Sequence, residues 1–222
     1  MKKRLVSLAA VLLCAVLAAL PAFAVAGDTV PAGPDLQVSA DYDWNRFRGQ
    51  NVTLYVYNWG LYISDGSDDS IDVVKGFEDL TGIKVNYTTF DTNESLYAKM
   101  KSGAANYDVI VPSDYMIGKM IGEDMLEPLD FENIPNFQYI SEKFRNPSYD
   151  PENRFSVPYT WGTVGLIYNY DMLGFDPDSW DIMWDPNYAK QILQFSNSKD
   201  AFAIALLRLG YSINTEEKFE LD

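Results

Sequence analysis

The sequence predicts an α/β protein built around a parallel sheet. Two observations lead to this prediction. Strand-like and helix-like stretches alternate from residue 52 to residue 121, and the third strand-like stretch is a short apolar run ended by Pro112, as expected for a buried parallel strand. Such alternation favours a sheet covered by helices, with ligands bound at the loops that follow the carboxyl ends of the strands.

The expected elements of the first half follow one another regularly. Residues 52–58 alternate as a strand, and a helix capped by Ser70 runs at helical spacing until Thr81 and Gly82 end it. Residues 83–90 alternate as a second strand. A second helix is expected over 93–101, the buried strand over 107–113, and a third helix near 115–121.

The second half contains fewer clear elements. Residues 128–155 are rich in loops and proline, and the alternation of residues 164–168 predicts a strand that crosses between lobes. A further strand is expected at 192–196, followed by a helix over 199–209 that Gly210 ends.

The last residues indicate an unfinished helix. Asn214 and Glu217 have the spacing of a capping box, yet the sequence stops a few residues later. We therefore expect a truncated chain. Because a half-built lobe exposes apolar surface, we also expect the isolated chain to be unstable or prone to aggregation.

The amino terminus predicts export. Residues 1–24 place three basic residues before an apolar run and the small residues of "PAFA", which is the order of a secretory signal peptide cleaved after Ala24. Residues 25–50 are rich in Pro, Gly and Asp and are expected to form a flexible leader. Cys14, the only cysteine, lies in the apolar run, so the mature chain is expected to need no disulfide.

Composition excludes several classes of function. Without Lys2, Lys3 and Arg4 the chain keeps 14 basic and 32 acidic residues, a net charge of −18, which argues against nucleic-acid binding and would attract cations. The absence of His and of mature Cys removes Ser-His-Asp triads, thiolate nucleophiles and His-rich zinc sites. The acidic stretch 65–69 lacks the spacing of a calcium loop, so no metal site and no cofactor are expected.

Seven phrases carry a resemblance to a known family, in order over about 160 residues: "LYVYNW", "FEDLTGIKVNY", "NESLYAKMKSG", "YDVIVPSDYMIGKM", "MLEPLD", "FSVPYTWGTVGLIYN" and "ALLRLGYSIN". From Val52 onward the chain resembles the bacterial extracellular solute-binding proteins for polyamines, the spermidine/putrescine-binding subunits of ABC importers. The resemblance implies a two-lobed α/β protein of the type II periplasmic-binding fold, which closes by hinge bending. Residues 51–157 would form the first lobe, and 158–222 the hinge crossover and the start of an incomplete second lobe.

The resemblance also implies a binding site at the strand ends. Trp59 and Tyr62 would be aromatic walls of the first lobe, and Ser113 and Tyr115 would supply hydroxyl groups and another ring. A linear polycation needs carboxylates for its ammonium ends and aromatic faces along its stem. These residue types suit that demand.

Across the cleft, the family places two acids three residues apart, and Asn197 and Asp200 stand at those positions. Asn197 is therefore a departure from the family pattern, as is Leu61, where the pattern often has Glu. Each lost partner of a desolvated ammonium would cost about 2 to 5 kcal/mol without compensation. Tyr159 and Trp161 are expected to pack in the hinge region.

Each candidate has a structural alternative. Trp59 would instead plug the hydrophobic core, although its position at a strand end favours a ligand wall, and Tyr62 and Tyr115 would be ordinary packing at the rim. Ser113 would cap the following helix, and Asp200 would complement a helix dipole in its first turn.

The function expected from these observations is non-enzymatic. A monomeric periplasmic protein would capture a small cationic solute, putrescine or spermidine, and deliver it to the membrane permease of an ABC importer. Three alternatives remain open: capture of a less charged solute, an exported glycoside hydrolase that uses two carboxylates, and a signalling or scaffold lobe that binds another protein.

Overall fold

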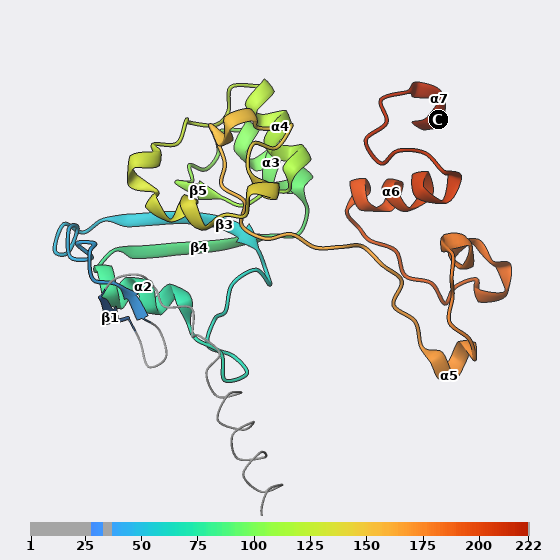
Figure 1. Ribbon diagram of the computed structural model, residues 1–222, viewed down its shortest axis with the longest axis horizontal. Helices are drawn as coiled ribbons and strands as arrows, with labels where there is room; N and C mark the ends of the chain where they lie inside the picture. Colours follow the sequence, from blue (N-terminus) through green and yellow to red (C-terminus); the bar gives the residue numbers. More distant parts are fainter. Residues whose placement is uncertain (1–27, 33–36, 222) are drawn as a thin grey trace, which may run out of the picture. The chain divides into compact units, whose positions relative to one another are not determined.

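A computed structural model describes residues 28–32 and 37–221 (Figure 1). The expected signal peptide, residues 1–24, lies outside the described residues. The chain divides into two compact units. One contains the described residues up to Leu54 together with Ile63–Asn86, and the other contains Tyr55–Tyr62 and the described residues from Tyr87 onward. The expected boundary between lobes after residue 157 stays a prediction.

Two short strands pair within the segment expected to be a leader. β1 (Thr29–Pro31) and β2 (Gln37–Ser39) run antiparallel, with Val30 opposite Val38. The Trp44 indole then donates a 2.7 Å hydrogen bond to the Ser39 carbonyl. Backbone pairing therefore begins before the first strand that the sequence predicts.

The N-cap of the first helix lies two residues after its predicted position. α2 (Val73–Thr81) has Asp72 at its N-cap, where the carboxylate accepts a 2.8 Å hydrogen bond from the Lys75 amide. Ser70, the predicted cap, instead donates its amide to the Ser67 carbonyl in the preceding turn. The predicted end is confirmed, because Gly82 follows the helix with φ 74°, a left-handed conformation that favours glycine.

The central sheet has three strands in the order β4-β3-β5. β3 (Thr53–Trp59) and β5 (Val109–Ile110) are parallel, with Val56 opposite Val109, and β4 (Lys84–Phe90) is the other neighbour of β3. The helices α3 (Asn93–Lys101) and α4 (Asp114–Gly122) follow β4 and β5. The predicted strands and helices of this part of the chain are confirmed, and β5 is shorter than predicted.

A hydrophobic core joins the sheet to these two helices. Tyr57 and Phe90 of the sheet pack with Leu96 of α3 and with Met116 and Met120 of α4, and all five are buried. The Tyr57 and Phe90 rings meet edge to face at 5.0 Å between centroids, a favoured aromatic geometry. Figure 1 shows α3 and α4 on the same side of the sheet.

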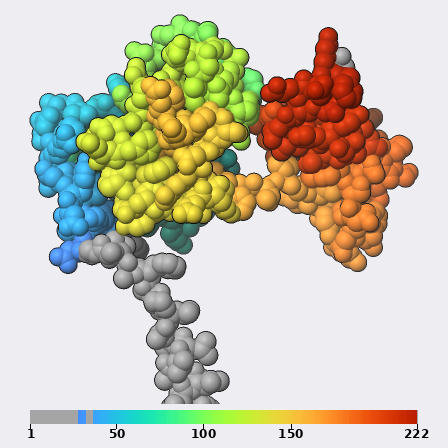
Figure 2. Space-filling view, turned by 45° about the horizontal axis from the view of Figure 1, so that its top comes forward, coloured from blue at the N-terminus to red at the C-terminus, as the bar shows by residue number. Residues whose placement is uncertain are grey.

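The loop-rich segment after α4 is held by buried polar groups. Its 3₁₀ turns are Phe131–Asn133, Pro135–Tyr139, Glu142–Phe144 and Pro151–Asn153. The buried Asp150 carboxylate accepts hydrogen bonds from the Phe155 amide (3.1 Å) and the Ser156 hydroxyl (2.6 Å). This segment lies on the surface next to α4 (Figure 2), where a Cβ on Gly118 would lie 3.3 Å from the Tyr149 Cβ.

Both strands predicted after residue 158 are wrong. Residues 164–168 and 192–196 have no strand assignment, and within the described part of the chain neither pairs with another strand. Ile167 and Leu193 are almost fully exposed, at 102% and 95%. An alternating sequence forms a strand only where a partner supplies the ladder hydrogen bonds.

Helical elements do form in this region. They are α5 (Tyr170–Leu173), the 3₁₀ turns Trp180–Trp184 and Pro186–Tyr188, α6 (Ser198–Leu209) and α7 (Lys218–Leu221). α6 confirms the predicted helix, and Gly210 ends it with φ 78°. The predicted capping box at Asn214 is wrong: the Thr215 hydroxyl accepts the Glu217 amide, and the short helix begins at Lys218.

Among the helices that the structure describes, none has both the length and the apolar character that crossing a bilayer requires.

Candidate functional site

Trp59 is the last residue of β3 and lies half-buried at the carboxyl end of the sheet. Its ring packs on Phe90 at 4.5 Å between centroids and also on Tyr62 at 6.0 Å. Trp59 therefore contacts the hydrophobic core with one part of its surface. This contact is the one expected if Trp59 packs in the core. Its role as an aromatic wall for a ligand stays a prediction.

Tyr62 stacks on a second tyrosine that the sequence assigned to hinge packing. The rings of Tyr62 and Tyr159 lie 6.3 Å apart at 22°, and the Tyr159 hydroxyl donates a hydrogen bond to the Tyr62 carbonyl. Both side chains are about half exposed, at 44% and 57%. The pair extends the aromatic surface that begins at Trp59.

Asn93 joins two strand ends and is fully buried. It opens α3, directly after Thr92, whose hydroxyl caps that helix by accepting the Ser95 amide. The Asn93 amide nitrogen donates to the Ser113 hydroxyl and to the Tyr115 hydroxyl, both at 3.0 Å. Its carbonyl oxygen accepts the Ser113 amide at 2.9 Å. One side chain thus connects the turn after β4 to the turn after β5.

Ser113 stands at the N-cap position of α4 but its side chain makes no capping hydrogen bond. The hydroxyl is engaged by Asn93 instead. The capping alternative for Ser113 is therefore wrong. The network around Asn93 holds the hydroxyl at the edge of the sheet where ligands bind in this class of fold.

The Tyr115 hydroxyl is the centre of this network. It accepts from Asn93 and lies 3.2 Å from Glu94 Oε1 and 3.3 Å from Asn197 Oδ1. A phenol has one hydrogen to donate, so it serves one of these two acceptors at a time. Burial, supported by the negative charges of Glu94 and Asp200, raises the Tyr115 pKa to about 12. The phenol is therefore neutral at physiological pH.

The residues at the start of α6 meet this network. Asn197 is the N-cap of α6, where its side-chain oxygen accepts the Lys199 amide at 3.3 Å. Its amide nitrogen donates to the Asp200 carboxylate at 2.9 Å. Asp200 is half-buried in the first turn of the helix, where its charge also complements the helix dipole. Both roles considered for Asp200 remain open.

Leu61 stands apart from these contacts. Its side chain is 97% exposed, on the loop between Trp59 and Tyr62. A neutral side chain that faces solvent supplies no charge for a ligand.

A model of the family described as "Bacterial extracellular solute-binding protein" matches residues 104–220, which contain Ser113, Tyr115, Asn197 and Asp200. The chain belongs to this family. The match spans the three turns that lead into α4, α5 and α6.

Two curated members of this group of solute-binding proteins are similar in sequence. The chain is 38% identical over 178 residues to the "Spermidine/putrescine-binding periplasmic protein" of Salmonella typhimurium, covering 78% of this chain and 48% of the relative. It is 33% identical over 184 residues to the "Putrescine-binding periplasmic protein SpuD" of Pseudomonas aeruginosa, covering 77% and 48%. The chain spans about half the length of the curated relatives it matches.

Solved structures of solute-binding proteins show the same fold. The "Putative spermidine/putrescine ABC transporter from Listeria monocytogenes" superposes with a TM-score of 0.70 and 41% identity, covering 76% of this chain and 51% of that one. The Tp0655 (TpPotD) lipoprotein of Treponema pallidum gives a TM-score of 0.69 at 32% identity, covering 76% and 51%. The α/β fold of the type II periplasmic-binding class, predicted from the sequence, is confirmed.

Three further residues belong to the network, and the sequence analysis did not select them: Asn93, Glu94 and Ser198. The Ser198 hydroxyl donates to Glu94 Oε1 at 3.2 Å. A signal for the first two was present, because "NES" begins three residues after the end of the predicted strand 83–90, in the loop position that "PSDY" occupies after the next strand. Nothing near Ser198 in the sequence distinguishes it from an ordinary first-turn residue.

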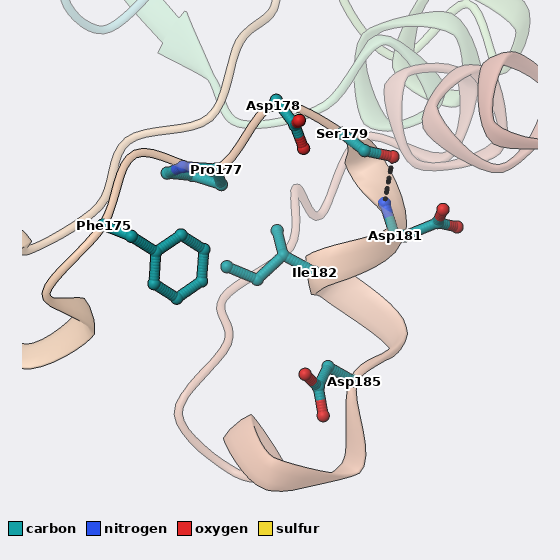
Figure 3. Close-up of a pocket in the computed structure, with 7 residues that line it drawn as sticks. All are labelled: Phe175, Pro177, Asp178, Ser179, Asp181, Ile182 and Asp185. Carbon is teal, nitrogen blue, oxygen red and sulfur yellow. Dashed lines mark hydrogen bonds between the residues drawn. The ribbon is translucent and has the colours of Figure 1, made fainter.

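Two hollows lie away from the predicted binding residues, none of which lines either hollow. The smaller, of about 400 Å³, has Phe175, Pro177 and Ile182 as an apolar wall (Figure 3). Its Asp181 carboxylate is already held by Arg208 at 2.7 Å. The larger, of about 590 Å³, is lined mainly by apolar side chains between residues 165 and 204. Asp178, Ser179 and Asp185 also line the smaller hollow. Because neither hollow includes a predicted binding residue, we place the candidate site at the Tyr115 network.

Proposed function

We propose that the protein is the extracytoplasmic solute-binding component of an ABC importer and that its solute is a polyamine, putrescine or spermidine. In this proposal it captures the solute without chemical conversion and delivers it to a membrane permease. The protein acts as a monomer. Residues 1–24 direct export and are then removed.

The Tyr115 network is the observation that carries the proposal. Residues predicted as binding residues from separate parts of the sequence, Ser113, Tyr115 and Asn197, lie within one chain of hydrogen bonds. That chain ends at the Asp200 carboxylate. The family match and the polyamine-binding relatives support the proposal from a second direction. A family of solute-binding proteins favours capture over the hydrolase alternative.

Each binding residue has a physical role in this proposal. Asp200 pairs with an ammonium group through a charge-assisted hydrogen bond. Trp59 and Tyr62 offer ring faces to the methylene stem and to the cationic charge. The Ser113 and Tyr115 hydroxyls orient the remaining polar groups of the solute.

The test is a calorimetric titration of the complete gene product with putrescine, spermidine and a neutral solute of similar length. Micromolar affinity for one polyamine that weakens as salt rises would support capture of a cation, since salt screens exposed charges. Absence of heat with both polyamines would overturn the proposal.

One observation favours a second candidate, capture of a less charged solute. The Asn197 amide already donates to Asp200 at 2.9 Å, and exposed Leu61 adds no negative charge. A neutral solute that binds more tightly than either polyamine in the same titration would select this candidate.

A further inference from the structure

Glu94 directs its carboxylate at the candidate site. It lies in the first turn of α3. Its Oε1 accepts a 3.2 Å hydrogen bond from the Ser198 hydroxyl and is one of the two acceptors, also at 3.2 Å, available to the Tyr115 hydroxyl. Tyr115 and Ser198 belong to different helices, α4 and α6. Glu94 therefore contacts both of the segments that bring predicted binding residues to the network.

The local structure of α3 does not account for this orientation. The capping role in α3 is filled by the Thr92 hydroxyl, which accepts the Ser95 amide at 3.1 Å. A carboxylate in the first turn complements the helix dipole from any rotamer that stays near the turn. The Glu94 side chain instead reaches out to two hydroxyl groups.

Glu94 also differs from the acid at the far end of the same pair of helices. Glu123 lies between Lys101 and Lys119, and hydrogen bonding to Lys101 lowers its pKa to about 2. Among the ion pairs of the described residues, none includes Glu94. Its neighbours are neutral hydroxyl groups, so its negative charge is not compensated by a cation of the described chain.

The number of negative charges at the candidate site indicates a function for the Glu94 carboxylate. Of the three positions where the family pattern places acids, Leu61 and Asn197 are neutral here, and this leaves Asp200 as the single predicted anion. We infer that Glu94 is a ligand-binding and specificity-determining residue whose carboxylate accepts an ammonium group of the cationic solute, supplying the negative charge that Asn197 lacks. This inference rests on the proposed function. It identifies Glu94 as the second negative charge, beside Asp200, for a solute with two ammonium groups.

The decisive experiment compares Glu94→Gln with the unaltered protein by calorimetric titration with putrescine. Loss of one charge-assisted hydrogen bond is expected to weaken binding about 10-fold to 100-fold, and the weaker complex should depend less on salt. Asp124→Asn is the matched control. Asp124 is exposed just after α4 with φ 54°, a conformation that Asn tolerates, and binding should change less than about twofold.

A second variant separates charge from positioning. Glu94→Gln combined with Asn197→Asp moves the negative charge to the other side of Tyr115, and both the affinity and the salt dependence should return toward those of the unaltered protein. If Glu94 served only to hold Tyr115, the relocated charge would restore neither, and that result would overturn the inference.

The inference and the proposed function fail in different ways. If the unaltered protein binds putrescine or spermidine and Glu94→Gln binds it equally well, the proposed function stands and the role of Glu94 is refuted. If the unaltered protein binds neither polyamine, the proposed function fails and the role of Glu94 fails with it. Urea melts of Glu94→Gln that match the unaltered protein would exclude misfolding as the cause of weaker binding.

Discussion

The part of the chain from β3 to α4 and the part from residue 158 to residue 221 differ in how their apolar side chains are used. In the first part, sheet and helix residues bury one another, and Leu96 and Met120 are fully inaccessible. In the second, Ile204 and Leu206 of α6 are buried, whereas Ile167 and Leu193 are almost fully exposed. Similar apolar residues thus contribute to stability in one region and remain in solvent in the other.

This difference separates two kinds of sequence signal. α6 forms because its signals are local: Asn197 caps its start and Gly210 ends it in a left-handed conformation. Strands at 164–168 and 192–196 need a partner that local sequence does not provide. Local signals therefore produce helices in both regions, and the sheet appears only where strands find each other.

The largest expected effect tests the burial contrast directly. Leu96→Ala should lower the free energy of unfolding by about 2 to 5 kcal/mol, because it leaves a cavity in the core. Ile167→Ala removes a fully exposed side chain, so the free energy of unfolding should change by less than about 0.5 kcal/mol. Urea melts of both variants measure this, and equal losses would remove the distinction between the regions.

Asn93→Ala should have the next largest effect. It removes three hydrogen bonds and leaves the Ser113 amide without its partner, at a cost of about 1 to 3 kcal/mol. Asn187→Ala, at an exposed position in the second region, is the control and should be nearly neutral. If Asn93→Ala is as stable as this control by urea melts, the two strand ends are not joined as described.

A smaller effect is expected at the end of α6. Gly210→Ala forces a Cβ into a conformation with φ 78°, which costs about 1 kcal/mol. Gly165→Ala is the control, since no heavy atom lies within 4 Å of its added Cβ. Amide hydrogen exchange should show faster opening of α6 in the first variant only. Unchanged exchange would mean that local signals do not set the end of this helix.

The smallest effect appears only at alkaline pH. The folded pKa of Tyr115, about 12, exceeds its ordinary value of 10 because of burial and the Glu94 charge. Its contribution to stability is therefore complete below pH 10 and is lost as the pH rises from 10 towards 12. The pKa values of Tyr87, Tyr149 and Tyr168 are also raised, so the ultraviolet titration of the unaltered protein is compared with that of Tyr115→Phe, which should lack one tyrosine that ionises near pH 12. A Tyr115 that ionises near pH 10 would contradict the buried network.

The sequence was sufficient for much of the first region because its signals are periodic and local. Alternation in residues 52–58 and 83–90 and the apolar stripe of α3 predicted elements that the structure contains. The cap of α2 was misplaced by two residues, because Ser70 and Asp72 are both good caps and a turn engages Ser70.

The candidate site was only partly predictable. Ser113, Tyr115, Asn197 and Asp200 were selected by resemblance, and the structure brings them into one hydrogen-bond network; their ligand roles stay predictions. Asn93 and Glu94 were missed because their partners are 20 or more residues away, and such pairings depend on how strand ends meet.

The Tyr115 network also has an imbalance between hydrogen-bond donors and acceptors. The single phenol hydrogen faces acceptors on both Glu94 and Asn197, and two carboxylates lie close by. An ammonium group brings three donors and no acceptor, whereas a carboxylate ligand brings only acceptors. This surface should therefore reject anionic solutes, such as dicarboxylates, before any fit of size or shape is considered.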